Sequence, residues 1–337
     1  MPQAPFMGGV RIAGTGLGLP PEVLSNSDLE SLMETSDEWI RQRTGVIERR
    51  RSDPYKKESA TYLAAEALTN ALKDASLEPS ELDLIIIATV SMEMTCPSTA
   101  CRVGDLIGAG TTGGYDLTAA CCGFVFGMNS AYSLIRSGAY KTIGVVGVDV
   151  LSEFIEYNTH GRGTAIIFGD GAGAAVFTAT DDATKGVIAQ KMYGDGSKWR
   201  DLYIPRKERD YPETGHPQEH KNGLMIMHGK EVFRFAVKTF PQIIQETLDE
   251  AGLSSDDISM FICHQSNARI LEAARERFGL PEEKLYVNID RFGNTSAGSV
   301  PICLHELRTQ GRLQEGELVM FVAFGGGLTW GSSLWRI

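Results

Sequence analysis

Two adjacent cysteines, Cys121 and Cys122, follow a run of small residues in the segment DLTAACCGFVFGM (116–128). The residues before them suit the end of a strand, and Gly123 permits a tight entry into an amphipathic helix. A cysteine at such an elbow faces unpaired helix N–H groups that favour an anion, so we expect the pKa of its thiol to fall and its thiolate to be a nucleophile. Either cysteine alone could instead fill space in the core, because cysteine is among the most buried residue types.

Three further segments place polar or flexible groups where an apolar strand ends. His264 follows SMFIC (259–263), Asn294 lies in RFGNTSAGS (291–299), and AFGGGLTWGSS (323–333) has three consecutive glycines. A histidine can move a proton, a carboxamide can donate a hydrogen bond, and a glycine turn exposes backbone N–H groups. Each has an ordinary explanation alone, as a structural histidine, a turn asparagine and a hairpin or bulge. Together with a cysteine they suit acyl transfer through a thioester.

The pattern of apolar runs indicates which elements position these groups. Short β-branched runs alternate with longer amphipathic stretches, which is typical of a layered α/β fold. A strand, a small-residue turn and a helix ending in Arg and Gly occur in this order twice. Cys121 lies 15 residues before Arg136 in the first copy, and Asn294 lies 14 residues before Arg308 in the second. The match predicts a duplicated chain.

We predict that the two copies are an N-terminal half, 1–182, with the nucleophilic cysteine and a C-terminal half, 183–337, with the histidine and the asparagine. In this arrangement Cys121, His264 and Asn294 all lie just beyond strand ends. Ligand sites of open α/β sheets occur at such ends.

Two other segments are interpreted as irregular. Residues 198–223 are polar, rich in charge and proline and without periodicity, which predicts a long surface loop. His216 and His220 within it have an H-x-x-x-H spacing but no third metal ligand nearby. The glycine-rich GTGLGLP (14–20) is not a G-x-G-x-x-G motif and predicts a turn.

The composition disfavours several classes of protein. The 337 residues include 32 Lys and Arg against 43 Asp and Glu, a net charge of −11, which argues against nonspecific binding to nucleic acid or to an anionic membrane. No apolar run has the length of a transmembrane helix, and the first residues lack the pattern of a secretory signal. The six cysteines form no C-x-x-C pair, so we expect no metal site and a reduced, cytoplasmic protein.

Four segments in order along the chain look like the signature segments of one family: DLTAACCGF, HQSNARI, RFGNTSAGSVP and AFGGGLTWGSSLWRI. TSDEWIRQRTGVIERR and GRGTAIIFGDGAGAAVF extend the likeness over nearly the whole chain. They resemble β-ketoacyl-ACP synthase III, a condensing enzyme of the thiolase superfamily, where ACP is acyl carrier protein. The resemblance implies a five-layered αβαβα architecture, a homodimer, and no metal or redox cofactor. The implied reaction condenses an acyl-CoA primer with malonyl-ACP, releases CO₂ and initiates fatty acid synthesis.

The same resemblance implies a role for each group in the site. Cys121 is the nucleophile, and Cys122 packs beside it. Neutral His264 and the Asn294 amide donate hydrogen bonds to the enolate formed from malonyl-ACP. The backbone N–H groups of Cys121 and Gly326 form an oxyanion hole, in which loss of one donor typically costs about 10²–10³-fold in rate.

The resemblance also implies how the CoA arm is held. Trp39 and Arg162 match a pair that sandwiches the adenine, a role that suits an indole and a guanidinium. Arg43 and Arg269 would meet phosphates. The positions that line the pantetheine tunnel are Gly229, Phe233 and Asn267. Without the resemblance, Trp39 would be a core aromatic and Arg43 a solvated charge at the end of a helix.

Two further implications concern partners. SMEMTCPSTA (91–100) matches a loop that helps to close the partner's acyl pocket in the dimeric family, and Cys96 replaces an aromatic residue that often precedes its proline. We therefore expect primers longer or more branched than acetyl. A local group of arginines would dock the acidic carrier protein, and these are Arg234, Arg269, Arg275 and Arg277. An ordinary charged helix explains them equally, because Glu272 and Glu276 lie among them.

Two rival functions fit the same residues. A related Cys-His-Asn acyltransferase would pass the acyl group to another acceptor without release of CO₂. A non-catalytic scaffold would retain the fold and only bind acyl-CoA, although such a protein would be expected to lose one of Cys121, His264 and Asn294. A scaffold would gain no covalent acyl mass when mixed with acyl-CoA.

Overall fold

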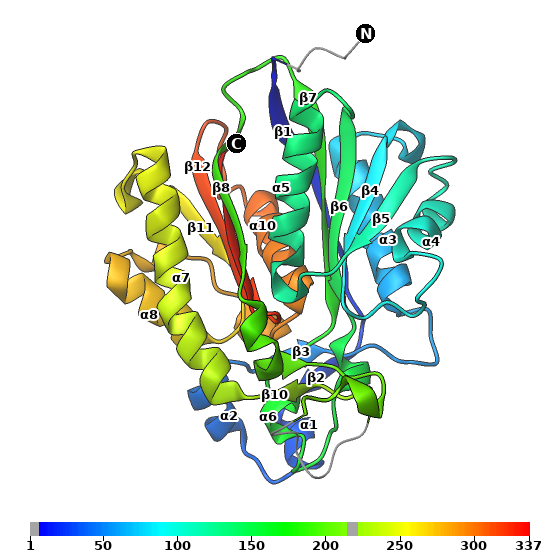
Figure 1. Ribbon diagram of the computed structural model, residues 1–337, viewed down its shortest axis with the longest axis vertical. Helices are drawn as coiled ribbons and strands as arrows, with labels where there is room; N and C mark the ends of the chain where they lie inside the picture. The colour runs from blue at the N-terminus through cyan, green and yellow to red at the C-terminus, as the bar shows by residue number, and fades with distance from the viewer. Residues whose placement is uncertain (1–6, 214–221) are drawn as a thin grey trace.

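The computed structural model describes residues 7–213 and 222–337, and two β-sheets stand side by side in it with helices between and outside them (Figure 1). The first sheet has the strand order β1-β7-β6-β4-β5. Its strands are β1 (Gly9–Gly18), β4 (Leu84–Ala88), β5 (Gly113–Leu117), β6 (Thr142–Asp149) and β7 (Gly171–Thr180). β7 runs antiparallel to β1 and β6, while β4 runs parallel to β5 and β6.

The second sheet repeats this plan with the order β8-β13-β12-β11. Its strands are β8 (Gly186–Gly194), β11 (Met260–Cys263), β12 (Leu318–Gly325) and β13 (Thr329–Arg336). β13 is antiparallel to β8 and β12, and β11 is parallel to β12. A parallel bridge between Phe261 and Leu285 stands where β5 lies in the first sheet. The chain is therefore a duplicated α/β structure, and the predicted boundary at 182/183 falls between β7 and β8.

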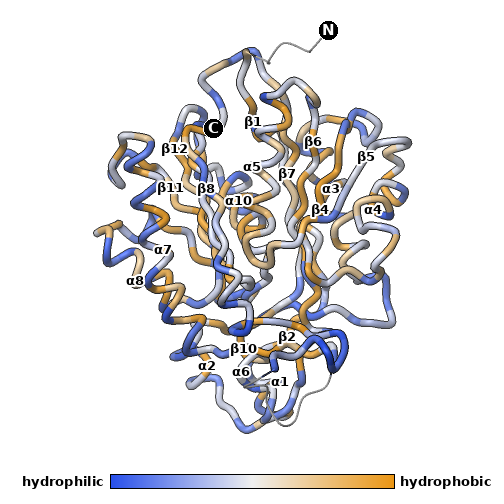
Figure 2. Tube along the Cα trace, in the orientation of Figure 1, coloured by the Kyte–Doolittle hydropathy of each residue, from blue (hydrophilic) through white to orange (hydrophobic). Residues whose placement is uncertain are grey.

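Helices between and outside the two sheets complete a structure of five layers (Figure 1). They are α3 (Ala60–Ala75), α4 (Thr99–Ile107), α5 (Gly123–Arg136), α7 (Gly229–Ala251), α8 (Ala268–Phe278) and α10 (Ser299–Thr309). The α3 and α4 helices cover the outer face of the first sheet, α7 and α8 cover that of the second, and α5 and α10 lie between the sheets. In Figure 2 the buried strands β4 and β11 are hydrophobic along their length, whereas α8 alternates, as expected for a helix with one buried face.

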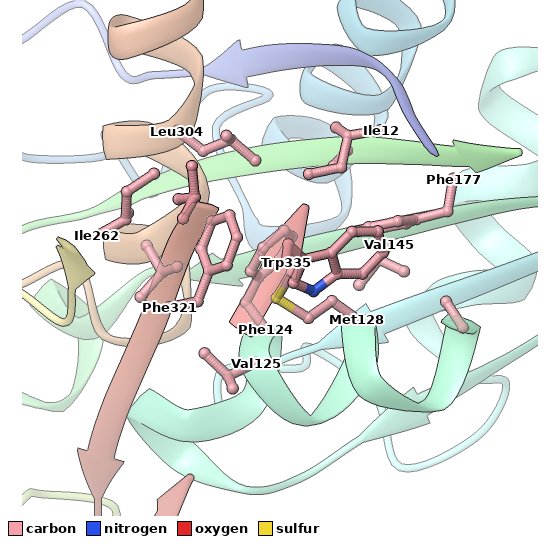
Figure 3. Packing of buried hydrophobic residues seen from close by; sticks show 14 of the residues in the cluster. Ile12, Phe124, Val125, Met128, Val145, Phe177, Ile262, Leu304, Phe321 and Trp335 are labelled. Atoms are coloured by element: carbon pink, nitrogen blue, oxygen red, sulfur yellow. The ribbon is translucent and has the colours of Figure 1, made fainter. Parts of the chain in front are cut away.

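The middle layer has a core that both halves share. Trp335 of β13 is fully buried, and its ring centroid lies 5.4 Å from that of Phe177 on β7 and 5.8 Å from that of Tyr132 on α5. Figure 3 shows Phe124 of α5 and Phe321 of β12 in the same cluster. Because these side chains come from both halves, the halves pack against one another through an apolar interior rather than through a polar domain interface.

The smaller elements gather at one end of the molecule, beyond the ends of the sheets (Figure 1). They are α1 (Asn26–Glu30), α2 (Asp37–Thr44), α6 (Arg162–Ala165), α9 (Ile289–Phe292), β2 (Val23–Ser25), β3 (Glu48–Arg50), β9 (Leu202–Tyr203) and β10 (Ile226–Met227). Among the described residues, no helix has both the length and the apolar character needed to cross a membrane.

Two expectations about irregular segments need correction. The turn expected at 14–20 is wrong, because residues 9–18 form strand β1. Its glycines let α3 approach the strand, since a Cβ on Gly16 would lie 2.3 Å from the carbonyl oxygen of Ala67. The loop expected at 198–223 contains the end of a 3₁₀ helix (Gly196–Asp201), the short strand β9 and a second 3₁₀ helix (Glu208–Asp210). His216 and His220 lie outside the described residues.

Candidate active site

The Cys121 elbow joins β5 to α5 through a 3₁₀ turn, η2 (Ala120–Cys122). Ala120 has φ +47°, in the left-handed region, and its neighbour Ala119 is fixed by a hydrogen bond from Thr329 Oγ1 to its carbonyl at 3.1 Å. Cys122 is fully buried in the core between the sheets. Cys121 is 6% exposed and lines two cavities. The two adjacent thiols therefore have different environments, and only Cys121 faces open space.

The two cavities meet at Cys121. The smaller one, of about 100 Å³, is lined by Cys121, His264 and Asn294 together. The larger one, of about 410 Å³, also includes Cys121 in its wall and is mainly apolar. Both cavities include Phe168 and Leu202 in their walls. The structure thus brings the three predicted catalytic residues, which come from both halves of the chain, to one cavity.

His264 follows β11 directly, and its backbone N–H donates to Val322 O at 2.8 Å, which continues the pairing of β11 with β12. Its Nδ1 lies 2.7 Å from Ser299 Oγ, and its ring packs edge-on against Phe324. Because Nδ1 is occupied, Nε2 is the nitrogen available to the cavity. A serine hydroxyl can donate or accept, so Ser299 supports either tautomer of the imidazole.

Asn294 is held by its backbone and by its side chain. Its N–H donates to Ile167 O at 2.8 Å, and its carbonyl accepts from Gly169 N at 3.0 Å. Its side-chain Oδ1 accepts from the backbone N–H of Ser296 at 2.8 Å. Because a backbone N–H can only donate, this bond fixes the orientation of the amide and leaves Nδ2 as the group that faces away from the turn.

The glycine turn after β12 approaches the elbow very closely. A Cβ on Gly325 would lie 2.7 Å from the backbone nitrogen of Cys121 and 2.9 Å from its Cβ. Gly326, the predicted oxyanion donor, lines the larger cavity together with Cys121, and a Cβ there would meet no atom closer than 3.5 Å. The turn is therefore tight at Gly325 and open at Gly326, and sequence reasoning assigned no role to Gly325.

The charge states of the thiol and the imidazole depend on burial. Burial raises the pKa of Cys121 to about 12, with a smaller contribution from the Asp149 carboxylate, while the Ser296 hydroxyl opposes the rise. The expected fall in this pKa is wrong, because burial of the thiolate away from water destabilises it more than the N–H groups of the elbow stabilise it. Burial lowers the pKa of His264 to about 3, so its imidazole is neutral at neutral pH.

The residues assigned to adenine are together but already in contact with one another. The guanidinium of Arg162 lies 4.7 Å from the centroid of the Trp39 ring, and that of Arg43 lies 5.5 Å from it. Arg162 also donates to Glu34 O at 2.6 Å. For the predicted stacking of a base between Trp39 and Arg162, the guanidinium would have to move off the indole.

The residues assigned to pantetheine line the smaller cavity, namely Gly229, Phe233 and Asn267. Asn267 also begins α8, where its side chain accepts from Arg269 N at 2.9 Å and donates to Arg43 O at 3.0 Å. Arg269 is exposed and outside this wall, with its guanidinium 5.4 Å from the Phe233 ring centroid. These contacts connect the wall of the smaller cavity, which includes Cys121, to the group formed by Trp39, Arg43 and Arg162.

The arginines proposed for docking differ in their surroundings. Arg234 forms an ion pair with Glu231 at 2.7 Å, and Arg275 forms one with Glu272. Arg269 and Arg277 are exposed on α8. Exposed pairs of this kind contribute little to stability, but they reduce the net positive charge of the face.

Cys96 is exposed and is not in the wall of either cavity within its own chain. Met92 of the same loop lines the larger cavity, and Thr95 accepts a hydrogen bond from Arg206 Nη1 at 3.2 Å. The loop therefore reaches the larger cavity through Met92. The role assigned to Cys96 in a partner's pocket stays a prediction.

Sequence reasoning missed part of the cavity wall and the residues behind the site. Leu202, Tyr203, Ile204 and Arg206 of the segment interpreted as a surface loop line the larger cavity. The polar composition of that segment concealed them, and the apolar triplet LYI (202–204) was the available signal. Ser299 was overlooked because it lies in a run of small residues, and nothing in that run indicates that its hydroxyl contacts His264.

The chain is similar to known proteins over most of its length. The family model for 3-oxoacyl-[acyl-carrier-protein (ACP)] synthase III matches residues 115–196, and that for its C-terminal part matches residues 248–337. The chain is 44% identical over 323 residues to β-ketoacyl-[acyl-carrier-protein] synthase III 1 of Bacillus cereus, which covers 96% of this chain and 97% of that protein. Among the described residues, no group of three or more His, Cys, Asp and Glu side chains is arranged to hold a metal ion.

Solved structures show the same similarity. The crystal structure of 3-oxoacyl-[acyl-carrier-protein] synthase III from Aquifex aeolicus has a TM-score of 0.89 and 41% identity, covering 98% of this chain and 100% of that one. The priming β-ketosynthase of the R1128 polyketide pathway has the same TM-score at 30% identity, covering 99% of this chain and 98% of that one.

Proposed function

The chain belongs to the β-ketoacyl-[acyl-carrier-protein] synthase III family, and we propose that it works through an acyl-enzyme on Cys121. Members of this thiolase-like family are condensing acyltransferases that initiate fatty acid synthesis. The substrates are an acyl-CoA primer and malonyl-ACP. The observation that carries the proposal is the single cavity lined by Cys121, His264 and Asn294.

In the first half-reaction the sulfur of Cys121 attacks the thioester carbon of acyl-CoA, a bond to that carbon forms, and the bond to the CoA sulfur breaks. The thiol proton passes to Nε2 of His264 and from there to the departing CoA thiolate, so the charges balance. Because the thiol is protonated and the imidazole neutral before the substrate arrives, proton transfer accompanies attack. The N–H groups of Cys121 and Gly326 stabilise the oxyanion.

In the second half-reaction malonyl-ACP occupies the cavity that CoA has left. Its carboxylate departs as CO₂, and its thioester oxygen becomes an enolate oxygen. Before this step the neutral imidazole of His264 loses its proton from Nδ1 and gains one on Nε2 by exchange with water, and Ser299 Oγ–H then donates to Nδ1. Nε2–H of His264 and Nδ2–H of Asn294 donate to the enolate oxygen, and Ser296 orients the Asn294 amide. The enolate carbon attacks the acyl group on Cys121, the bond to sulfur breaks, and the Cys121 thiolate takes up a proton from water to restore the thiol.

We place the primer's acyl chain in the larger cavity, because it starts at Cys121 and its wall is mainly apolar. The CoA and ACP arms then share the smaller cavity and the path past Phe233 toward Trp39. A cavity of about 410 Å³ supports primers longer or more branched than acetyl. Met92 and Leu202 would limit the chain length.

The remaining assignments belong to the same proposal. The chain would act as a homodimer in the cytoplasm, without a metal or redox cofactor, and the arginines of α7 and α8 would receive the acidic carrier protein. The exposed edge of β5 supports dimer formation, because Tyr115 there is 39% exposed and the strand is the last of its sheet.

A condensation assay tests the proposal. Malonyl-ACP and a series of acyl-CoA primers of two to six carbons are mixed with the protein, and CO₂, free CoA and β-ketoacyl-ACP are measured together. The expected result is equal amounts of all three, with the best rate for a primer longer than acetyl. CoA release without CO₂ would favour an acyltransferase with another acceptor, and neither product would favour a binding scaffold. Activity with acetyl-CoA alone would contradict the assignment of the larger cavity.

A further inference from the structure

The carboxyl group of Asp149 lies behind the active site, at the end of β6, and the mechanism above does not use it. It is 0% exposed. Its Oδ1 accepts from Val90 N at 2.8 Å, from Thr89 Oγ1 at 3.1 Å and from Ser91 Oγ at 3.2 Å. These donors come from the segment that follows β4, so one oxygen of Asp149 is bound entirely within the first half of the chain.

The other oxygen binds the second half. Oδ2 accepts from Ala297 N at 3.3 Å, and the hydroxyl of Ser296 is also a hydrogen-bond partner of the carboxyl group. Both residues belong to the 3₁₀ turn η8 (Ser296–Gly298), which precedes α10. A buried carboxyl group is stable only when donors replace its lost hydration, and here backbone N–H groups from both halves provide part of that replacement.

The turn η8 in turn orients Asn294. The N–H of Ser296 binds Asn294 Oδ1 at 2.8 Å, and Ser296 has φ +49°, a backbone conformation that a residue with a side chain rarely adopts. Such a conformation persists when the surroundings determine it. The contacts on Asp149 Oδ2 are next to this residue in the chain and supply that constraint.

We propose that Asp149 is a positioning residue for the condensation step, which holds the η8 turn so that Asn294 presents its amide to the enolate. The proposal rests on the proposed function, because it requires that Asn294 donate in the second half-reaction. The first half-reaction depends on Cys121, His264 and the glycine turn, and Asp149 forms its hydrogen bonds with other residues. The Asp149 carboxylate raises the pKa of the Cys121 thiol and the Ser296 hydroxyl of η8 lowers it, so the effects of disturbing both on acylation oppose one another. Disturbing Asp149 should therefore separate the two half-reactions.

The variant Asp149→Asn keeps the size of the side chain and replaces one acceptor oxygen by an NH₂ group. The new NH₂ group cannot accept a hydrogen bond, yet it must face a backbone N–H group, either that of Val90 or that of Ala297. The bond to Ala297 is the longer, at 3.3 Å against 2.8 Å, so the NH₂ group should turn toward the η8 turn and displace it. A displacement of about 1 Å in a reacting group can cost about 10²-fold in rate.

Asp170 offers a matched control. It is also 0% exposed, and its carboxyl oxygens accept from Ser52 N at 2.8 Å and from Ser152 N at 2.9 Å. It lines neither cavity, and its carboxyl group hydrogen-bonds Ser52 and Ser152 rather than η8. Asp170→Asn therefore repeats the chemical change at equal burial without removing an acceptor from the turn.

The experiment measures acylation as CoA release and acyl mass on the protein, and condensation as CO₂ and β-ketoacyl-ACP from the preformed acyl-enzyme. For Asp149→Asn we expect condensation to fall by about 10–100-fold while acylation stays within about threefold of wild type. For Asp170→Asn we expect the two rates to change in the same proportion. In an Asn294→Ala background, Asp149→Asn should produce no further loss of condensation.

Equal proportional loss of both rates in Asp149→Asn, or an unchanged condensation rate, would overturn the proposal. If Asp149→Asn does not fold, Ser91→Ala removes a donor from the far side of the carboxyl group, and a ratio of condensation to acylation equal to that of wild type would also overturn it. A wild-type protein that releases neither CoA nor CO₂ would instead refute the proposed function, and this inference with it.

Discussion

The two halves of the chain contain the same elbow, used in two different ways. In the first, Ala119 (φ −141°, ψ 27°) and Ala120 (φ +47°) lead through a 3₁₀ turn into α5; in the second, Thr295 (φ −90°, ψ 24°) and Ser296 (φ +49°) lead into α10. Cys121 and Ala297 are the corresponding residues that follow. The elbow backbones are alike, so the chemistry depends on what faces each of them.

The difference lies at the end of the neighbouring central strand. Asp149 ends β6, and its carboxyl group binds the N–H of Ala297. Gly325 ends the equivalent strand β12, and a side chain there would begin 2.7 Å from the nitrogen of Cys121. The elbow at Ala297 thus has an acceptor on its N–H, whereas at the Cys121 elbow the corresponding residue is a glycine without a side chain. On the proposed mechanism, the oxygen of the substrate takes the place that the Asp149 carboxyl group occupies in the other half.

The largest effect should come from the residue at which the elbows differ. Cys121→Ala should lower condensation by about 10⁴-fold or more, because loss of a nucleophile removes the covalent route. Cys122→Ala, one residue away and fully buried, should retain the rate within a few-fold and lose about 1–2 kcal/mol of stability. Rates and thermal unfolding of the two variants are the measurement, and a reversal of their order would mean that the wrong thiol faces the substrate.

Substitutions of Gly325 and Gly326 test whether the space beside the Cys121 N–H receives the oxygen of the substrate. Gly325→Ala puts a methyl group against the Cys121 nitrogen and should slow acylation by about 10²–10³-fold, comparable to the loss of an oxyanion donor. Gly326→Ala is the matched control, since its Cβ would meet no atom closer than 3.5 Å, an ordinary van der Waals contact, and its N–H remains. Both are measured as CoA release in a single turnover. Equal rates for the two variants would exclude the oxyanion site at this turn.

The pH dependence of alkylation tests whether burial raises the pKa of Cys121 more than the N–H groups of the elbow lower it. For a thiol with a pKa of about 12, the thiolate fraction rises tenfold for each pH unit below that value, so modification of Cys121 by iodoacetamide should accelerate about 100-fold from pH 7 to pH 9. If the elbow dominated and lowered the pKa below 7, the rate would be flat over this range. Cys121→Ala corrects for the exposed thiols of Cys96 and Cys101.

The smallest effect should come from residues far from both elbows. Trp39→Ala should raise the KM for acyl-CoA by about tenfold and leave kcat unchanged, because an adenine stacked on an indole far from the reacting atoms contributes equally to binding in the ground state and in the transition state. Acyl-pantetheine, which lacks the adenine, serves as the control substrate and should show no change. A fall in kcat with both substrates would place Trp39 in a structural role.

Much of this architecture follows from patterns in the sequence. The repeated order of strand, turn and helix predicted the duplication because the apolar periodicity of β4, β6, β11 and β12 is strong in both copies. The strand β1 was missed because its glycines resemble a turn, and only the packing of α3 shows why they are needed. Local composition cannot report a contact with a helix some 50 residues away.

The site was predictable in its residue types but not in its electrostatics. Cys121, His264 and Asn294 could be selected as strand-end residues, and their common cavity is consistent with that choice. The pKa of Cys121 could not be predicted, because it depends on burial and on Asp149, a residue of another strand. Ser299 was out of reach for the same reason, since its contact with His264 spans 35 positions of the chain.

The acyl group itself gives the most direct test of the account. The protein is incubated with acyl-CoA alone, its intact mass is recorded, and the modified residue is identified by peptide mapping before and after addition of malonyl-ACP. We predict one acyl group per chain, on Cys121, which disappears as β-ketoacyl-ACP forms. An acyl group on any other residue, or full product formation with no acyl group on Cys121, would contradict it.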